Sequence, residues 1–332
     1  MFKFGFYPPA EATEEQQQHQ QRPPSPPTAA DAAATDDARL DAAATADQNA
    51  ASRVIEGAAR TAIPSGVTAP PAQALAWQSG GLTLVRAVPS ANACPEAPQE
   101  SDLVPGVYEG GLKVWEASLD LVDHLVSSGG DGNGGVFAED EATVVTGRRK
   151  RVLELGCGHG FPGIVALQQG LRVCFSDFNR EVIEQVTIPN VKLNVEERYW
   201  PLAEYYSGDW NSLSPLLEER DGGELFDLIL TAETLYTTVV ADKVLGMVLK
   251  HLSPGGQALV ASKRFYFGTG GSTQYFRDKA AATGRLVCLD TGVIDTGKGN
   301  IREILRVSWR DEEAAARAGA VAIAGDGRKA SR

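Results

Sequence analysis

After residue 148 the sequence alternates short apolar runs with segments of helical periodicity, and this alternation constrains the fold more than any other feature. The runs have the length and composition of buried strands: RVLELG, RVCFSD, LFDLILTA, QALVASK and LVCLDTG. Helices are expected between them at residues 161–169, 181–197, 211–219, 239–252 and 272–283. A last run, REILRVSWR, is expected to close the sheet as an antiparallel strand. A further short apolar strand is expected just before SGDW at 207–210. With it, the predicted fold class is α/β: a Rossmann-like, seven-stranded, mostly parallel sheet with helices on both faces and a disordered N-terminal arm.

The N-terminal third of the chain lacks the apolar residues that a core requires. Residues 8–75 are rich in Ala, Gln, Pro, Asp and Glu and cannot bury enough apolar area to offset chain entropy, so a disordered arm is predicted. Ahead of it, the Phe residues of MFKFGF alternate with other residues, which suits a short anchor over residues 1–7 or is an accident of composition. Residues 76–310 are expected to form one folded domain, and residues 311–332 a flexible tail, either a loose helix or disordered.

Composition excludes several functional classes. A net charge of −12 argues against direct nucleic-acid binding, which rests on Lys and Arg neutralising phosphates. No apolar run is long enough to span a membrane, and the start of the chain lacks the features of a signal sequence. The four cysteines form no CxxC pair, so no metal site is predicted, and reduced thiols fit a cytoplasmic and nuclear protein. The basic run at residues 148–151 is interpreted as a solvated strand entrance rather than a nuclear-import patch.

The stretch ELGCGHG, residues 154–160, follows the first buried strand, where nucleotide-binding sheets carry a glycine-rich turn. Gly156, Gly158 and Gly160 have the spacing GxGxG, whereas a dinucleotide-binding turn has GxGxxG and faces a pyrophosphate. The carboxylate of Glu154 would repel a diphosphate and attract a ligand that carries an ammonium and a sulfonium. The turn therefore predicts an S-adenosylmethionine site, contacted by Glu154, Gly156 and Gly158, with the two residues between the glycines as spacers.

Polar residues at the next two strand ends complete the predicted cofactor pocket. Asp177, in FSDFN, lies about 20 residues after the first glycine and is placed to accept hydrogen bonds from both ribose hydroxyls. In SGDW, which follows a short apolar strand, Asp209 is expected to accept the adenine amino group while Trp210 stacks on the ring.

The stretch TAETLY, residues 231–236, follows the strand LFDLILTA. Ala232 leaves room for the cofactor, and Glu233 and Tyr236 are expected to face the substrate. Glu233 could instead cap the helix that follows, and the sequence leaves both roles open.

Together these motifs resemble the seven-strand S-adenosylmethionine-dependent methyltransferases and, among them, the protein-histidine N-methyltransferase family. The matching stretches are GVYEGGLKVWE at 106–116, VLELGCGHGFPGI at 152–164, VTIPNVKLN at 186–194, SGDW at 207–210, DLILTAETLY at 227–236 and ASKRFYFGTGG at 261–271. The resemblance covers roughly residues 100–309 and implies that residues 76–310 form a methyltransferase domain.

Carried over by position, the resemblance implies a set of cofactor contacts from five segments of the chain: Val114, Trp115, Glu116, Ala117, Ser118, Gly156, Ser176, Asp177, Phe178, Gly208, Asp209, Trp210 and Ala232. Trp115 rests on the resemblance alone, because its helical periodicity predicts a core position.

The resemblance also implies a reaction: methylation of a histidine ring nitrogen in a protein, typically a large-subunit ribosomal protein, with effects on ribosome assembly or translation. Neutral imidazole already offers a lone pair at pH 7. We therefore hypothesise that Glu233, oriented by Tyr236, hydrogen-bonds the far ring nitrogen while the near one faces the methyl group. The stretch RFYFGTGG, residues 264–271, either clasps a substrate loop or forms an ordinary turn with buried aromatic residues.

Two alternatives remain open from the sequence. A protein-lysine N-methyltransferase of the same superfamily is the nearest, and it would need the substrate ammonium deprotonated before attack. A non-catalytic S-adenosylmethionine-binding scaffold is the other. The spacing of the turn disfavours an NAD-dependent enzyme, and TAETLY lacks the prolines expected in a nucleic-acid amino methyltransferase.

Overall fold

The computed structural model describes residues 59–60, 72–79, 82–89, 102–129, 135–138, 147–220, 223–297 and 299–318, with the backbone alone for 59–60, 72–79, 129 and 220. The anchor predicted at residues 1–7, most of the arm and the tail beyond residue 318 lie outside the described residues.

The chain divides into two units, residues 1–56 with 96–109 and residues 57–95 with 110–332. In the first unit, Val104 and Tyr108 exchange two backbone hydrogen bonds of 2.8 Å and so close a tight turn.

The second unit is built from strands and helices that alternate from residue 151 onward. Its strands are β1 (Ala59–Arg60), β2 (Ala72–Ser79), β3 (Leu82–Ala87), β4 (Arg151–Leu155), β5 (Arg172–Asp177), β6 (Ala203–Ser207), β7 (Phe226–Ala232), β8 (Leu252–Lys263), β9 (Leu286–Ile294) and β10 (Arg302–Trp309). Its helices are α2 (Glu116–Gly129), α4 (Phe161–Gln168), α5 (Arg180–Val182), η2 (Ile183–Thr187), α6 (Ile188–Asn194), η3 (Glu197–Leu202), α7 (Trp210–Arg220), α8 (Thr238–His251) and α9 (Thr273–Ala282), and residues 311–318 are also helical.

The main sheet has the strand order β1-β6-β5-β4-β7-β8-β10-β9 within the described residues. Strands β6, β5, β4, β7 and β8 are parallel, and β10 is antiparallel to both of its neighbours. The predicted α/β class and the seven-stranded, mostly parallel sheet are therefore confirmed. The two-residue strand β1 adds to the seven and, like the start of β2, falls within the range predicted for the arm.

The antiparallel strand at REILRVSWR is also confirmed, but its place in the sheet is not an edge. Strand β10 lies between β8 and β9, so its residues are mostly buried. The expectation of a buried strand at LVCLDTG is wrong beyond Leu286. Within the described part of the chain β9 is the last strand of the sheet, paired with β10, and its Leu289 is exposed.

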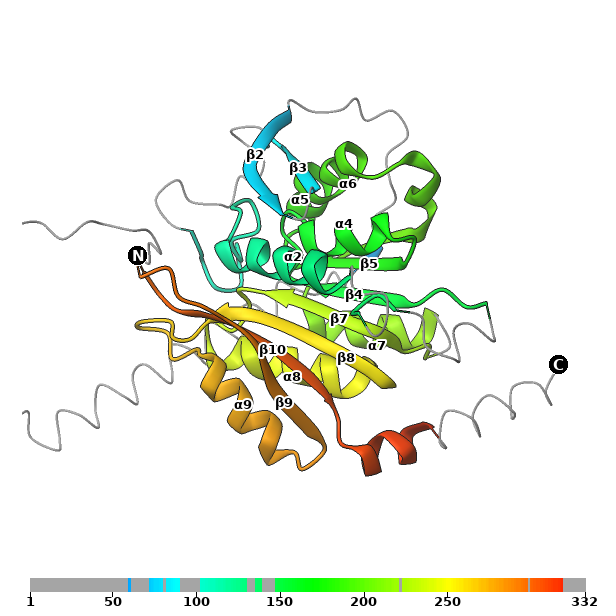
Figure 1. Cartoon of the computed structure of the whole chain (residues 1–332), viewed down its shortest axis with the longest axis vertical. Helices are drawn as coiled ribbons and strands as arrows, with labels where there is room; N and C mark the ends of the chain where they lie inside the picture. The colour runs from blue at the N-terminus through cyan, green and yellow to red at the C-terminus, as the bar shows by residue number, and fades with distance from the viewer. Residues whose placement is uncertain are drawn as a thin grey trace, which may run out of the picture. The chain divides into compact units, whose positions relative to one another are not determined.

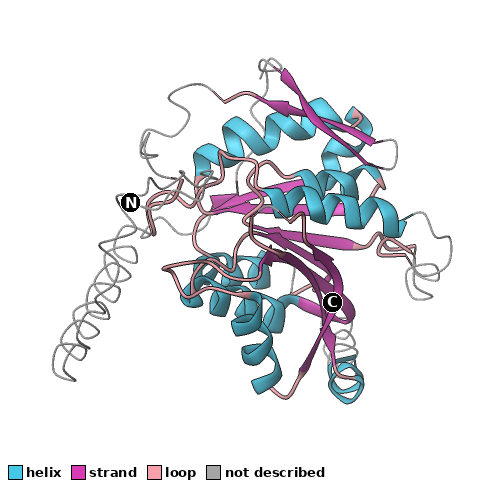
Figure 2. Ribbon diagram, turned by 60° about the vertical axis from the view of Figure 1, so that its left-hand side comes forward, coloured by secondary structure: helices cyan, strands magenta, loops and turns pink. Residues whose placement is uncertain are grey.

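Helices cover both faces of the sheet, as Figures 1 and 2 show. Helices α2, α4 and α6 pack against one another on one face, and α7, α8 and α9 pack in sequence on the other. The core between the sheet and the first layer includes Phe161, Ile164 and Phe175, all of which are fully buried. No described helix combines the length and the apolar character needed to cross a membrane.

The helix predicted at residues 181–197 is interrupted where the chain approaches a proline. Residues Ile183–Thr187 form a π-helical turn just before Pro189, which has no backbone N–H to continue the regular ladder. The interruption brings the Thr187 hydroxyl under the glycine-rich turn, where it donates to the Gly158 carbonyl oxygen at 2.7 Å. The break in the helix therefore supports the glycine-rich turn.

The β2–β3 hairpin forms its own small sheet and is attached through two asparagines of α6. The side-chain amide of Asn194 accepts from the Val85 N–H at 2.8 Å and donates to the Val85 carbonyl at 2.7 Å, as a neighbouring strand would. Asn190 accepts from the Ala87 N–H in the same way. These contacts account for both asparagines of VTIPNVKLN.

The interpretation of the basic run at 148–151 as a solvated entrance is wrong for its last member. Arg151 is 2% exposed, stacks on the Phe226 ring and donates to the Glu224 carbonyl at 2.7 Å. Arg148 forms two hydrogen bonds with Asp227, at 2.7 and 3.0 Å. These arginines join the start of β4 to the start of β7.

Phe175 should be essential for the packing beneath the glycine-rich turn. It is fully buried in β5 and stacks on Tyr205 with ring centroids 5.5 Å apart. Because Phe175→Ala leaves a cavity there, we expect the free energy of unfolding, measured by urea denaturation, to fall by about 3–5 kcal/mol. Leu289→Ala on the exposed edge strand is the control and should cost less than about 0.5 kcal/mol. Similar losses in the two variants would contradict this account.

Candidate active site

The carboxyl ends of β4, β5, β6 and β7 lie at one edge of the sheet, and the turns after them touch. Gly156 has φ of +61°, in the left-handed region that favours glycine. A Cβ at this position would lie 2.8 Å from Cγ2 of Thr234, in the loop after β7, and 3.7 Å from Cζ2 of Trp210, at the start of α7. The predicted residues Gly156, Trp210 and Ala232 therefore come from turns in direct contact.

Asp177 is bonded to the glycine-rich turn itself. Its Oδ2 accepts from the Gly158 N–H at 2.9 Å, and its Oδ1 accepts from the Asn179 N–H at 3.1 Å. Its backbone carbonyl accepts from the Gly208 N–H at 2.9 Å. These bonds fix the orientation of Asp177 at the edge of the glycine-rich turn, where the contact with the ribose hydroxyls is predicted.

Glu154 lies behind the same turn and is buried. Its Oε2 accepts from the N–H of Gly163, in the first turn of α4, at 2.9 Å. Burial raises the pKa of Glu154 well above its ordinary value, the Gly163 bond opposes that rise, and the nearby Asp177 adds to it. A ligand cation would offset the cost of holding two carboxyl groups here. The predicted cofactor, which carries positive charge and ribose hydroxyls, fits this set of groups.

The loop before α2 lies over the glycine-rich turn and is held by His159, which was expected to be only a spacer. His159 Nε2 lies 3.0 Å from the Leu112 carbonyl oxygen, which can only accept, so Nε2 carries the proton. Its Nδ1 then accepts from the Asn190 side chain at 3.1 Å. Burial lowers the pKa of His159 to about 4, so the ring is neutral at pH 7. The position of His159 inside the turn did not indicate that its side chain holds the loop before α2.

The loop brings Trp115 to the site. The Trp115 indole is half-buried, and its Nε1 donates to the Gly110 carbonyl oxygen at 3.0 Å. The Lys263 ammonium, at the end of β8, lies 5.3 Å from the centre of the indole ring. Trp115 thus faces the site from one side while Lys263 enters from the other.

The other predicted cofactor contacts have mixed surroundings. Val114 and Ala117 pack on the core, Ser118 donates to the Trp115 carbonyl at 2.6 Å, and Glu116 pairs with Arg302 at 3.1 Å. Ser176 donates to the Glu154 carbonyl at 2.9 Å, and Phe178 is half-buried after β5. The roles predicted for these residues in binding the cofactor stay predictions.

Asp209 has two partners that the sequence did not indicate. Its Oδ1 accepts from the Asn211 N–H at 2.8 Å in the first turn of α7, and its Oδ2 pairs with Lys243 at 2.7 Å. Both carboxylate oxygens are thus engaged by the protein, and the predicted contact with the adenine amino group would have to share them.

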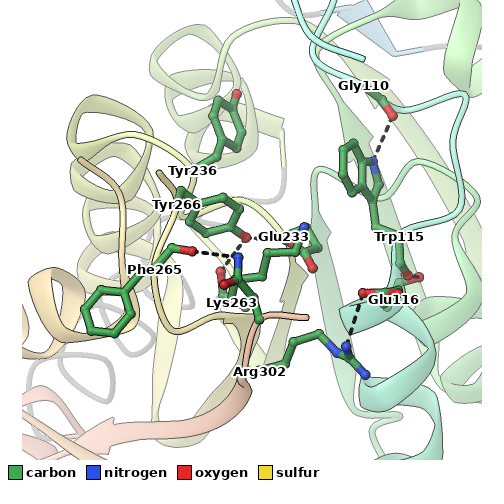
Figure 3. A network of polar contacts seen from close by, with 12 residues as sticks. Gly110, Trp115, Glu116, Glu233, Tyr236, Lys263, Phe265, Tyr266 and Arg302 are labelled. Carbon is green, nitrogen blue, oxygen red and sulfur yellow. Dashed lines mark hydrogen bonds and ion pairs between the residues drawn. The ribbon is translucent and has the colours of Figure 1, made fainter. Parts of the chain in front are cut away.

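Glu233 is the most unusual residue of the site. Among the described residues it alone, apart from glycines, has a positive φ, at +57°. Its side chain is buried: Oε2 accepts from the Tyr266 hydroxyl and lies 3.8 Å from the Lys263 ammonium. Its Oε1 has no hydrogen-bond partner among the described residues. Figure 3 shows this carboxyl between Trp115 on one side and Tyr266 and Lys263 on the other.

The structure excludes one of the two roles left open for Glu233, that of helix cap. Helix α8 begins at Thr238, and its cap is the Thr237 hydroxyl, which accepts from the Val240 N–H at 3.2 Å. Glu233 is therefore not the helix cap. Its hydrogen-bonding tyrosine is Tyr266 rather than the predicted Tyr236, whose ring points away from the carboxyl in Figure 3.

A groove of about 400 Å³ lies between α7 and α8, lined in part by Lys243, Met247 and Trp210, the last of which is also a predicted cofactor contact. No residue of the Glu233 network lines it. We assign the candidate active site to the edge of the sheet because the buried acids and the glycine-rich turn meet there. Within the described residues, no group of three or more His, Cys, Asp or Glu side chains is arranged to hold a metal ion.

The observed sheet is the Rossmann-like one that the sequence predicts, and a methyltransferase domain family matches residues 139–282. The predicted class and cofactor are thereby confirmed. The chain is 38% identical over 209 residues to the histidine protein methyltransferase 1 homolog of Dictyostelium discoideum, a match that covers 63% of this chain and 61% of that protein. It is 34% identical over 219 residues to the homolog of Rattus norvegicus, covering 59% and 56%.

The resemblance to the protein-histidine methyltransferases is confirmed by these relatives, and the chain spans about three fifths of their length. Among solved structures, the glycopeptide N-methyltransferase MtfA superposes with a TM-score of 0.37 and 13% identity, over 51% of this chain and 94% of that chain. A likeness this distant says nothing about the reaction.

Asp177→Asn should weaken cofactor binding. Asparagine has nearly the same size and can still accept from the Gly158 N–H, but it lacks the charge and one acceptor. We expect the affinity for S-adenosylmethionine, measured by isothermal titration calorimetry, to fall about 10- to 100-fold. Asp278→Asn makes the same change on the exposed face of α9, where the carboxylate accepts from Gln274, and should leave the affinity unchanged. Equal affinities in the two variants would show that Asp177 does not contact the cofactor.

Proposed function

We propose that the chain is an S-adenosylmethionine-dependent protein-histidine N-methyltransferase. The observation that carries the proposal is the Glu233 carboxyl, which is buried near the glycine-rich turn, with Oε2 held by Tyr266 and Oε1 buried without a hydrogen-bond partner among the described residues. An acceptor of this kind suits the N–H of a neutral imidazole. The relatives' name, histidine protein methyltransferase, supports histidine as the methylated residue.

The residues of the site would divide the work between holding the cofactor and orienting the substrate. Glu154, Asp177 and the glycine-rich turn would hold S-adenosylmethionine, which supplies a methyl group already activated by its sulfonium. The Glu233 carboxylate accepts a hydrogen bond from the ring nitrogen that carries the proton. This bond fixes the tautomer of the substrate histidine and directs the other ring nitrogen toward the cofactor. The same carboxylate then holds the proton that the methylated ring releases. The chain's contribution is chiefly the placement of these groups.

A protein substrate fits the surface beside the acid. In the stretch 264–271, Phe265 is 53% exposed and Phe267 is 77% exposed, while Tyr266 between them is buried. Exposed phenylalanines on one short loop favour contact with a macromolecule. The expected turn with buried aromatic residues holds for Tyr266 alone, and the substrate clasp stays a prediction, which the exposure of Phe265 and Phe267 supports.

We propose a large-subunit ribosomal protein as the substrate. We also propose that the enzyme acts in the cytoplasm and nucleus. The motif resemblance supports it, and the net charge of −12 favours a basic partner such as a ribosomal protein.

The reaction is tested by supplying labelled S-adenosylmethionine and ribosomal proteins from cells that lack this enzyme, and by locating the product by mass spectrometry. We expect methylhistidine from the wild type and none from Gly156→Arg, whose side chain collides with Thr234. Glu233→Gln should bind the cofactor normally and turn over about 10²- to 10⁴-fold more slowly.

Other outcomes of this assay would redirect the proposal. Label on lysine would indicate the lysine methyltransferase, and no protein label with cofactor still bound would favour the non-catalytic scaffold. A Glu233→Gln variant that loses cofactor affinity, with no separate loss of turnover, would reject the catalytic role of Glu233.

The double variant Phe265→Ser/Phe267→Ser should raise KM for the protein substrate about 10-fold, because each serine removes apolar area that docking would bury. Affinity for S-adenosylmethionine should not change. Leu289→Ser removes an exposed leucine from β9 and is the control, with KM expected to stay within about twofold of the wild type. An unchanged KM in the double variant would place substrate docking elsewhere.

A further inference from the structure

We propose that Tyr266 is the positioning residue of the site: it holds the Glu233 carboxylate through Oε2 and thereby presents Oε1 to the substrate imidazole. The inference rests on the proposed function and deepens it, since it names the group that orients the acid. Tyr266 lies 33 residues after Glu233, on a different loop.

The hydrogen bonds around Tyr266 have a fixed direction. Its hydroxyl has one proton, which goes to Oε2 of Glu233, because a carboxylate can only accept. The Ser262 hydroxyl, 2.8 Å from the same phenolic oxygen, must then donate to Tyr266. Ser262 and Tyr266 are both buried, so this chain of two bonds lies away from water and each bond strengthens the other. The chain leaves Oε1 as the acceptor without a partner among the described residues.

The backbone around Tyr266 is also fixed. Its N–H donates to the Gly271 carbonyl at 3.0 Å, and a Cβ at Gly271 would lie 2.0 Å from the Leu235 carbonyl oxygen. Short antiparallel bridges join Phe265 to Ser272 and Thr237 to Gly270. The loop that carries Tyr266 is therefore packed directly on the loop that carries Glu233, and the phenol has a defined place from which to hold the carboxylate.

Charged groups face Glu233 from three further elements. Lys263 of β8 lies 3.8 Å from Oε2, and Glu116 of α2 and Arg302 of β10 act on the carboxylate from the other side. Burial raises the pKa of Glu233 and Glu116 adds to the rise, whereas Lys263 and the Tyr266 hydrogen bond pull it down. The nearby Ala117 N–H also lowers it, although it forms no hydrogen bond with Oε1. Removing the Tyr266 hydroxyl deletes one of the groups that favour the carboxylate, so the pKa of Glu233 must rise further.

Tyr266→Phe tests the proposal in the full chain, because it removes the hydroxyl and keeps the ring. The titration of the Glu233 carboxyl, followed by carbon NMR and assigned with Glu233→Gln, should move up by about one pH unit. The kcat for histidine methylation should fall on the order of 10-fold with KM nearly constant, and the loss should be largest at low pH, where less carboxylate remains. Cofactor affinity should not change.

The matched control is Tyr275→Phe. Tyr275 also donates to a carboxylate, at 3.0 Å from Asp242, but on the exposed surface of α9. This variant should leave both the Glu233 titration and kcat unchanged.

An unchanged Glu233 titration in a folded Tyr266→Phe variant would overturn the proposal, as would a kcat loss that is independent of pH. If Tyr266→Phe does not fold, Ser262→Ala weakens the same chain of bonds and should shift the titration in the same direction by a smaller amount; no shift would reject the proposal. A wild type that makes no methylhistidine would reject the proposed function instead, while the NMR titration would still decide whether Tyr266 holds Glu233.

Discussion

The site depends first on the parallel pairing of β4 with a strand on each side. Leu155, the last residue of β4, is opposite Ser176 of β5 and Thr231 of β7. This register places the glycine-rich turn, Asp177 and the Ala232–Glu233 step next to one another, although they are far apart in the sequence. Parallel strands end at one edge, so each turn there meets its neighbours. The hydrogen bond from Gly158 to Asp177 and the contact of Gly156 with Thr234 follow from that alignment.

The second constraint acts on the conformation of Glu233. A left-handed backbone at a glutamate costs free energy and persists only where the surroundings impose it. Here the Glu233 N–H donates to the Ala261 carbonyl at 2.9 Å, which continues the pairing of β7 with β8 by one residue beyond the strand. Thr237 caps the following helix and leaves the glutamate side chain available. The strained residue is thus the one whose carboxyl oxygen is buried without a partner among the described residues, which is the arrangement expected of a functional group.

The sequence predicted those parts of the structure that depend on neighbours in the chain. Apolar runs located the strands of the parallel sheet, and the residues at their ends, Glu154 and Asp177, lie at the glycine-rich turn as expected. Pairings made by the fold were missed: Lys243 with Asp209, His159 with Leu112, and Tyr266 with Glu233. Three consecutive aromatic residues at 265–267 look alike in a sequence, and only the loop's packing separates the buried one from the exposed two. The place of β10 inside the sheet likewise needed tertiary pairing that periodicity does not encode.

The insertion of β10 between β8 and β9 bears on how the protein is made. During synthesis β8 and β9 are complete before β10, the strand that lies between them. Until β10 is made, the edges of β8 and β9 that pair with it have no partner strand. Arg302 of β10 also pairs with Glu116, 186 residues earlier in the chain, and so joins the last strand to the first long helix beside the acid. Contacts of such long sequence separation form late, because the intervening chain must first be closed into a loop. The surroundings of Glu233 are therefore completed only when nearly the whole domain has been synthesised, and a nascent chain lacks the assembled candidate site.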